Sequence, residues 1–404
     1  MELVYRSVSW LLLAAYGSAP IAAAVHAYIQ HKRGRSLPSI RLAATATVGV
    51  VLGVTLCVVY GFAIGGRAGV GQIALTVYLA IALLVLLKFG DAGLQKLLRG
   101  HDPGKARKRI AAVARLLVLV FVGLPAVMSA VMTYRVKVVP RATPLTELGV
   151  AFQDVTFRAD DGTRLAGWWI PDPAGNTERT VVLAHGLGGG KADFLPMAAQ
   201  FVPHGYNVLM LDCRAHGGSG GQRSSFGKRE ARDVAAAFAW VVENRPTAAR
   251  QLFGVGASMG AAALIHAAAD NPDVDAIAVV GTYEDLGTMA GDATDQVFTW
   301  PVSEIAKWVA LPLASAHAGT DLAAFRPADA AANLWPRPLL VVHAENDEII
   351  PFRHAEALHA AAAQPKRQYW SDTGGHNELL GSSTVGEEIR LFFDAARVVR
   401  VARM

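Results

Sequence analysis

The pattern of apolar and polar positions changes character about a third of the way along the 404-residue chain. Up to residue 134 the chain has long apolar stretches that are nearly free of charged side chains. A bilayer core is crossed by about 20 apolar residues in a helix. The sequence therefore predicts a transmembrane region over 1–134 with four helices, at 7–30, 42–66, 68–87 and 113–134.

The charges divide at nearly the same place. Residues 1–141 hold 17 Lys and Arg against three acidic residues, whereas 142–404 hold 21 basic and 30 acidic residues. The net charge of +5 is therefore no signal for nucleic-acid binding, and we expect no nucleic-acid partner. The basic residues gather between the first and second and between the third and fourth predicted helices, which favours a cytoplasmic side for these connectors. We expect a multi-pass protein of the plasma (inner) membrane, with the bilayer as partner and the remaining chain extracytoplasmic.

After a short tether at 135–150, the pattern switches to short apolar runs separated by segments of helical spacing. Such alternation predicts a doubly wound, mainly parallel sheet with helices on both faces. Two runs around Asp161-Gly162 predict a β-hairpin. We expect this α/β domain to span 151–404, with a helical lid at 283–334 where the rhythm breaks. The expected strands are 154–158, 164–170, 180–184, 207–211, 251–255, 276–280, 338–343 and 367–370.

The strongest chemical motif is the pentapeptide Gly-Ala-Ser-Met-Gly at 256–260. It follows an expected strand and opens an expected helix, which is the setting of a nucleophile elbow. Small residues permit a tight turn that leaves Ser258 exposed, and the helix N-terminus adds the positive end of a dipole. The alternative is a glycine-rich turn that only packs a helix on a strand.

A nucleophilic serine needs a general base, and the base needs a carboxylate that orients it. Asp347 follows the expected strand at 338–343, and His376 follows the strand at 367–370. The order Ser, Asp, His is that of the α/β hydrolases. Glu345 competes with Asp347 for the role of the acid. Histidines on the expected helices, His354 among them, are expected in solvated or core roles.

A third motif, His-Gly-Leu-Gly-Gly-Gly at 185–190, follows the strand at 180–184. Its glycines let backbone amides turn toward one point, so that with the Met259 amide they form an oxyanion hole. A phosphate loop is the rival interpretation, but Ala192 stands where Ser or Thr would bind magnesium. The run Gly254-Val255-Gly256 lacks the third glycine of a dinucleotide fingerprint. Because no paired His or Cys spacing indicates a metal site either, we expect no cofactor and no metal.

Together these motifs resemble the α/β-hydrolase superfamily, in particular its serine-aminopeptidase-like and dienelactone-hydrolase-like branch. The resemblance covers about 151–400 and includes the runs at 154–157, 161–162, 165–168, 185–186 and 212–219 as well as the elbow. It implies the α/β-hydrolase fold, with Ser258, Asp347 and His376 as the catalytic triad. It also implies the amides of Leu187 and Met259 as the oxyanion hole, and the loop 214–219 at the active-site side.

The expected function is that of a membrane-embedded serine hydrolase that cleaves an ester, thioester or amide through an acyl-enzyme. The lid carries Phe298, Trp300 and Trp308, which line an acyl pocket, dip into the lipid head-group layer or pack the lid onto the domain. A carboxylesterase or lipase acting on lipid-like or acylated substrates is therefore favoured. A membrane-bound serine peptidase and a catalytically inactive membrane interaction module are the alternatives.

Overall fold

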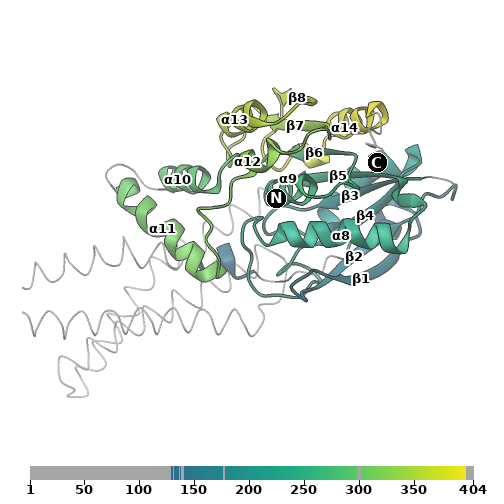
Figure 1. Ribbon diagram of the computed structural model, residues 1–404, viewed down its shortest axis with the longest axis horizontal. Coiled ribbons are helices and arrows are strands. Elements are labelled where there is room, and N and C mark those ends of the chain that lie inside the picture. Colours follow the sequence, from purple (N-terminus) through teal and green to yellow (C-terminus); the bar gives the residue numbers. More distant parts are fainter. Residues whose placement is uncertain are drawn as a thin grey trace, which may run out of the picture. The chain divides into compact units, whose positions relative to one another are not determined.

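The computed structural model describes residues 129–396, apart from 131, 136, 138–140, 176–177 and 298–301 (Figure 1). All of these residues belong to a unit that begins at Met128. The predicted helices 7–30, 42–66 and 68–87 lie outside the described residues, as does most of the fourth, 113–134. The described end of that fourth helix is helical up to Thr133, and Tyr134 then forms an antiparallel bridge with Arg223.

The predicted multi-pass membrane location needs correction. Within the described part of the chain, no helix is both long enough and apolar enough to cross a bilayer. The longest described helix, α11 (Val302–Ala318), has 17 residues and carries the charged pair Glu304 and Lys307. Helices such as α8 (Glu230–Asn244) and α14 (Ser383–Ala395) are short and half-polar because they cover a sheet on one side and face solvent on the other.

The sheet has eight strands in the order β1-β2-β4-β3-β5-β6-β7-β8. Strands β1 and β2 form the predicted hairpin, and β2 also pairs antiparallel with β4. All the remaining pairs are parallel, which confirms the prediction of a mainly parallel sheet. The strands are β1 (Gln153–Arg158), β2 (Arg164–Ile170), β3 (Arg179–Ala184), β4 (Asn207–Asp212), β5 (Gln251–Ala257), β6 (Ala276–Val280), β7 (Leu339–Ala344) and β8 (Lys366–Ser371).

Helices cover both faces of this sheet (Figure 1). Successive residues of a strand point to opposite faces. On β3, Val182 therefore belongs to an apolar cluster that includes residues of α8, α9 and α13, whereas its neighbour Leu183 belongs to a second cluster that includes residues of α7 and α14. The central strands are buried on both faces, which is why they appear in the sequence as continuous apolar runs. These helices are α7 (Leu195–Phe201), α8 (Glu230–Asn244), α9 (Met259–Ala269), α13 (Arg353–Ala361) and α14 (Ser383–Ala395).

Between β6 and β7 the chain forms α10 (Leu286–Val297), α11 and α12 (Pro327–Ala331). This is the segment for which the sequence predicts a lid. A separate apolar cluster joins it to the rest of the domain and includes Tyr283, Leu286, Phe325 and Ile350. A further short helix, α6 (Pro144–Leu148), lies in the predicted tether.

Candidate active site

The turn between β5 and α9 holds Ser258 in a backbone conformation that L-residues rarely adopt, with φ of 51° and ψ of −119°. Two glycines make this turn possible. A Cβ on Gly256 would lie 2.6 Å from the Gly260 oxygen, and a Cβ on Gly260 would lie 2.3 Å from the Ala184 oxygen. Since both obstacles are backbone atoms, the motif requires glycine at its two ends, and α9 thereby packs directly on the end of β3.

Neighbouring loops fix the Ser258 backbone at the carboxyl end of the sheet. The Ser258 amide donates a hydrogen bond to the Val280 oxygen over 2.8 Å, and the Thr282 hydroxyl donates to the Ser258 oxygen over 3.0 Å. On the other side, a Cβ on Gly186 would lie only 3.2 Å from the Ser258 Cβ. The serine therefore sits between the loops that follow β3 and β6.

The imidazole of His376 also lies against the loop that follows β6. Gly281, with φ of 56°, lies between the two residues that hold the Ser258 backbone. A Cβ there would be 3.3 Å from both Cε1 and Nδ1 of His376. The ring and Ser258 thus lie against the same loop, although the hydrogen bonds of the described residues do not include one between the Ser258 hydroxyl and His376.

The acid beside His376 is Asp347. Its Oδ2 lies 2.7 Å from Nδ1 of His376, and its Oδ1 accepts hydrogen bonds from the amides of Ile349 and Ile350 over 2.9 and 2.8 Å. Burial alone would raise the pKa of Asp347, but His376 and the two amides lower it below its usual value. The competing residue, Glu345, has an exposed side chain two positions earlier, at the end of β7.

The two candidate oxyanion amides flank the serine. Met259 is the first residue of α9, and Leu187 follows the close contact between Gly186 and Ser258. Within the described part of the chain, neither amide has a hydrogen-bond partner. Two unpaired N–H groups beside a nucleophile are the arrangement that stabilises a developing oxyanion.

Two histidines that sequence reasoning did not assign to the site hold the loop after β3. His185 donates from Nδ1 to the Gly186 oxygen over 2.7 Å and accepts the Cys213 amide at Nε2 over 3.0 Å. His216 donates from Nδ1 to the Arg214 oxygen and accepts the Gly188 amide at Nε2 over 3.1 Å. Each ring is therefore neutral. Burial lowers the pKa of His185, and burial together with the neighbouring His185 lowers the pKa of His216 to about 3.

A buried ion pair supports the same loop from the end of β4. Asp212 accepts the Lys191 ammonium over 2.5 Å, the Lys191 amide over 2.8 Å and the Gly218 amide over 2.8 Å. Burial by itself would raise the pKa of Asp212, but the charge and hydrogen bonds of Lys191 lower it. One carboxylate thus joins the loop at 185–190 to the loop at 214–219.

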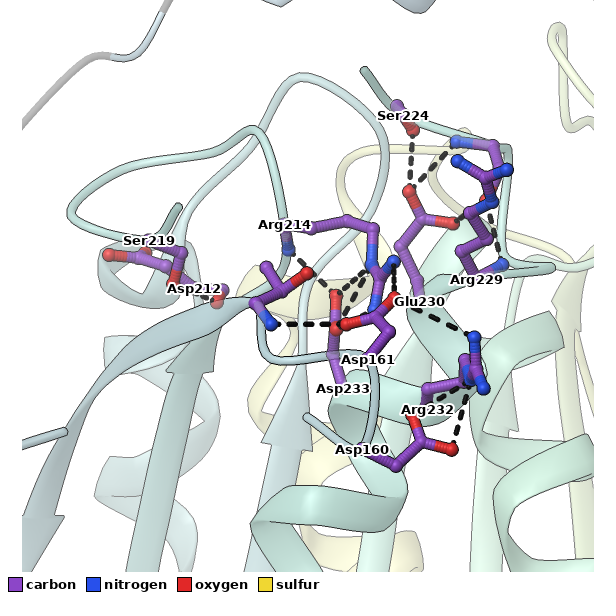
Figure 2. A network of polar contacts seen from close by, with 12 residues as sticks. Asp160, Asp161, Asp212, Arg214, Ser219, Ser224, Arg229, Glu230, Arg232 and Asp233 are labelled. Atoms are coloured by element: carbon purple, nitrogen blue, oxygen red, sulfur yellow. Dashed lines mark hydrogen bonds and ion pairs between the residues drawn. The ribbon is translucent and has the colours of Figure 1, made fainter. Parts of the chain in front are cut away.

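Further polar contacts fix the start of α8 (Figure 2). Arg214 bonds Asp233 on α8 and Asp161 in the β1–β2 turn. Glu230, which is fully buried, accepts hydrogen bonds from the hydroxyls of Ser224 and Ser225 and from the amides of Ser225 and Gly227. Within this loop, the Ser224 hydroxyl also lies 3.3 Å from the sulfur of Met259, so the network reaches the first residue of α9.

Of the three lid aromatics, Phe298 and Trp300 lie outside the described residues. Trp308 on α11 is 83% exposed, which argues against the interpretation that it packs the lid onto the domain. Among the described residues, no group of three or more His, Cys, Asp or Glu side chains is placed to hold a metal ion.

Several known proteins are similar to parts of this chain. A family model described as serine aminopeptidase, S33, matches residues 175–324, which include the elbow but neither Asp347 nor His376. The chain is 28% identical over 229 residues to YfhR of Escherichia coli strain K12, covering 55% of this chain and 73% of YfhR. It is also 28% identical over 263 residues to Rv2307c of Mycobacterium tuberculosis H37Rv, covering 65% and 85%. Both relatives are described only as uncharacterized proteins.

Among solved structures, the esterase Pf2001 of Pyrococcus furiosus is similar with a TM-score of 0.53 and 20% identity, covering 65% of this chain and 95% of the esterase. The hypothetical protein PA2218 of Pseudomonas aeruginosa is similar with a TM-score of 0.50 and 18% identity, covering 65% and 97%. Identities this low show the fold alone. The chain has the α/β-hydrolase fold, and this fold together with the family match supports a hydrolase.

Proposed function

We propose that the protein is a serine hydrolase that works through an acyl-enzyme, with Ser258 as nucleophile, His376 as general base and Asp347 as orienting acid. The observation that carries the proposal is that Ser258 and the His376–Asp347 pair both contact the loop that follows β6. Val280 and Thr282 hold the strained backbone of Ser258, and the His376–Asp347 pair lies against the residue between them.

The proposed chemistry follows from these contacts. With its Nδ1–H donated to Asp347, the His376 ring leaves Nε2 to take the proton of the Ser258 hydroxyl and return it to the leaving group. The amides of Leu187 and Met259 then hold the oxyanion of the tetrahedral intermediate. Removing one such donor typically costs about 2.7–4 kcal/mol of transition-state stabilisation. No cofactor enters this mechanism.

For the substrate we propose a carboxylic ester with an acyl chain. The exposed Trp308 on α11 supports this choice, because an apolar ring that does not pack the domain is available to a lipid-like or acylated substrate. The fold similarity to an esterase points the same way. An amide or peptide substrate is the second candidate, favoured by the match to a serine aminopeptidase family model.

A fluorophosphonate probe tests the nucleophile, because it labels only an activated serine. We expect labelling of the wild type and of Ser383→Ala, which alters an exposed serine on α14, and no labelling of Ser258→Ala. Activity of Ser258→Ala should fall below about a hundredth of the wild-type value. Its thermal midpoint should stay within a few degrees, since a single hydroxyl is lost. Labelling of Ser258→Ala, or activity above that level, would contradict the assignment.

A substrate panel separates the two candidate functions. We expect purified protein to hydrolyse p-nitrophenyl esters of two- to twelve-carbon acids faster than aminoacyl p-nitroanilides. Faster turnover of the anilides would favour the peptidase instead. Ser258→Ala serves as the blank for both substrate classes, so hydrolysis that survives in it belongs to a contaminant.

A further inference from the structure

A buried charged cluster joins the first lid helix to the helix that follows the acid loop. His354 is the second residue of α13, and its side chain is fully buried. Its Nδ1 faces the Glu284 carboxylate, and its Nε2 lies 2.7 Å from Oδ2 of Asp292 on α10. Arg353, also on α13, pairs with the same Asp292. Two cations of α13 thus meet two carboxylates of the segment that follows β6.

The geometry of the ring fixes its protonation state. A neutral imidazole carries one N–H and donates to one acceptor only, whereas the imidazolium donates from both nitrogens. Because both nitrogens of His354 face carboxylates, the imidazolium is the form of the ring that donates to both of them. Burial by itself would lower the pKa of His354, but the hydrogen bonds and charges of Glu284 and Asp292 raise it above its usual value. Another titratable group near this ring is His343 on β7, whose Nε2 lies 3.4 Å from Oδ2 of Asp347 and whose pKa burial lowers.

The acid loop lies between this cluster and the active site. The amide of Ile350 donates to Asp347, and its side chain belongs to the same apolar cluster as Tyr283 and Leu286 of the lid segment. On α10, Gln296 donates to the Ile349 oxygen over 3.4 Å. The loop that holds the Asp347 carboxylate is therefore packed against the same helix that His354 binds.

We propose that His354, with Glu284 and Asp292, is a positioning residue that clamps α10 onto α13 and thereby holds the acid loop in place. This inference rests on the proposed function. His354 touches no reacting group and acts through Asp347 and the β7–α13 loop.

The clamp has a definite dependence on pH. A histidine whose pKa is raised in the folded state contributes stability that is complete below its ordinary pKa and is lost as pH rises through the raised value. Above that value one ring nitrogen presents a lone pair to a carboxylate, and the contact becomes repulsive. The clamp therefore holds at neutral pH and loosens on the alkaline side.

The first experiment measures the thermal midpoint between about pH 6 and about pH 10, a range that spans histidine titration. We expect the midpoint of the wild type and of the inactive Ser258→Ala to fall as pH rises through the His354 pKa. The fall should begin at lower pH in Glu284→Gln and be absent in His354→Gln. The same alkaline fall in His354→Gln as in the wild type would overturn the clamp. Since Ser258→Ala is included, this result does not depend on the proposed catalysis.

The second experiment measures kcat and KM with p-nitrophenyl butyrate over the same range. We expect kcat of His354→Gln to fall roughly ten- to a hundredfold at neutral pH, because small displacements of a catalytic group cost about that much. Fluorophosphonate labelling should persist, since Ser258 and His376 remain. Glu284→Gln, which keeps the shape of the cluster, should shift the alkaline loss of kcat to lower pH. Wild-type kcat at every pH in both variants would refute the positioning role.

Discussion

Arg214 offers a sharp test of how the loops around the site are held. Its side chain is 6% exposed; Nη2 bonds Asp233 over 2.6 Å and Nη1 bonds Asp161 over 2.7 Å. The Asp233 carboxylate is fully buried, and the Arg214 amide also donates to it over 2.8 Å. Arg214→Met removes the guanidinium but keeps most of the side-chain length. It leaves the Asp233 carboxylate buried without its cation (Figure 2).

Removing one partner of a buried ion pair costs about 3–5 kcal/mol. Burial raises the pKa of Asp233 to about 7 even with Arg214 in place, so without the guanidinium the buried carboxylate is left without its cation or takes up a proton. We expect Arg214→Met to lower the free energy of unfolding by that amount. Arg232 provides a matched control, since it binds Asp160 in the same network but is 49% exposed, with its partner 65% exposed. An exposed pair contributes about 0–1 kcal/mol, so Arg232→Met should have a small effect.

Urea unfolding at pH 7 measures both effects, with the midpoint lowered and the slope unchanged. The double variant Arg214→Met, Asp233→Leu should regain most of the lost free energy, because replacing both charges by apolar side chains is often close to neutral. Equal losses in Arg214→Met and Arg232→Met would refute the reasoning. So would a double variant as unstable as Arg214→Met.

Other substitutions test single contacts. Trp308→Ala should change the free energy of unfolding by less than about 0.5 kcal/mol in urea, because the ring is 83% exposed; a larger loss would show that it packs the lid. Gly260→Ala should cost at least about 1–3 kcal/mol and abolish fluorophosphonate labelling, because its Cβ collides with the Ala184 oxygen; normal labelling would argue against the required glycine. The pKa of Asp347 is lowered in the folded protein, so its ionised form adds stability that is lost as pH falls below about 4. Between pH 5 and 3 the thermal midpoint should therefore fall less in Asp347→Asn than in the wild type, and equal falls would count against the Asp347–His376 contact.

Much of the fold was predictable because its signals are local. The buried parallel strands are continuous apolar runs, and both ends of each expected strand lie within two residues of the ends of an observed strand. The elbow was also predictable. Glycine is required at Gly256 and Gly260 because a Cβ at either position would collide with backbone atoms of the turn or of the neighbouring strand. The choice between Asp347 and Glu345 was not decided by sequence. It depends on which side chain is buried against His376.

Features that depend on distant partners were not predictable. His354 was expected in a solvated or core role, yet it is a charged residue whose partner Glu284 lies 70 positions away in the sequence. His216 likewise gains its role only when β3 and β4 lie side by side and bring Gly188 to its ring. The exposure of Trp308 depends on how α11 lies on the domain, which apolar spacing along a helix does not specify.

The two edge strands of the sheet, β1 and β8, affect how readily the protein aggregates. An edge strand with unpaired backbone groups is a template for aggregation unless charged side chains guard it. β8 begins with Lys366 and Arg367, and β1 ends with Arg158, so both edges carry cations. Lys366 also donates to three carbonyl oxygens, those of residues 359, 360 and 362, at the end of α13. One lysine thus caps the helix that begins at the acid loop and discourages a foreign strand from joining the sheet beside it.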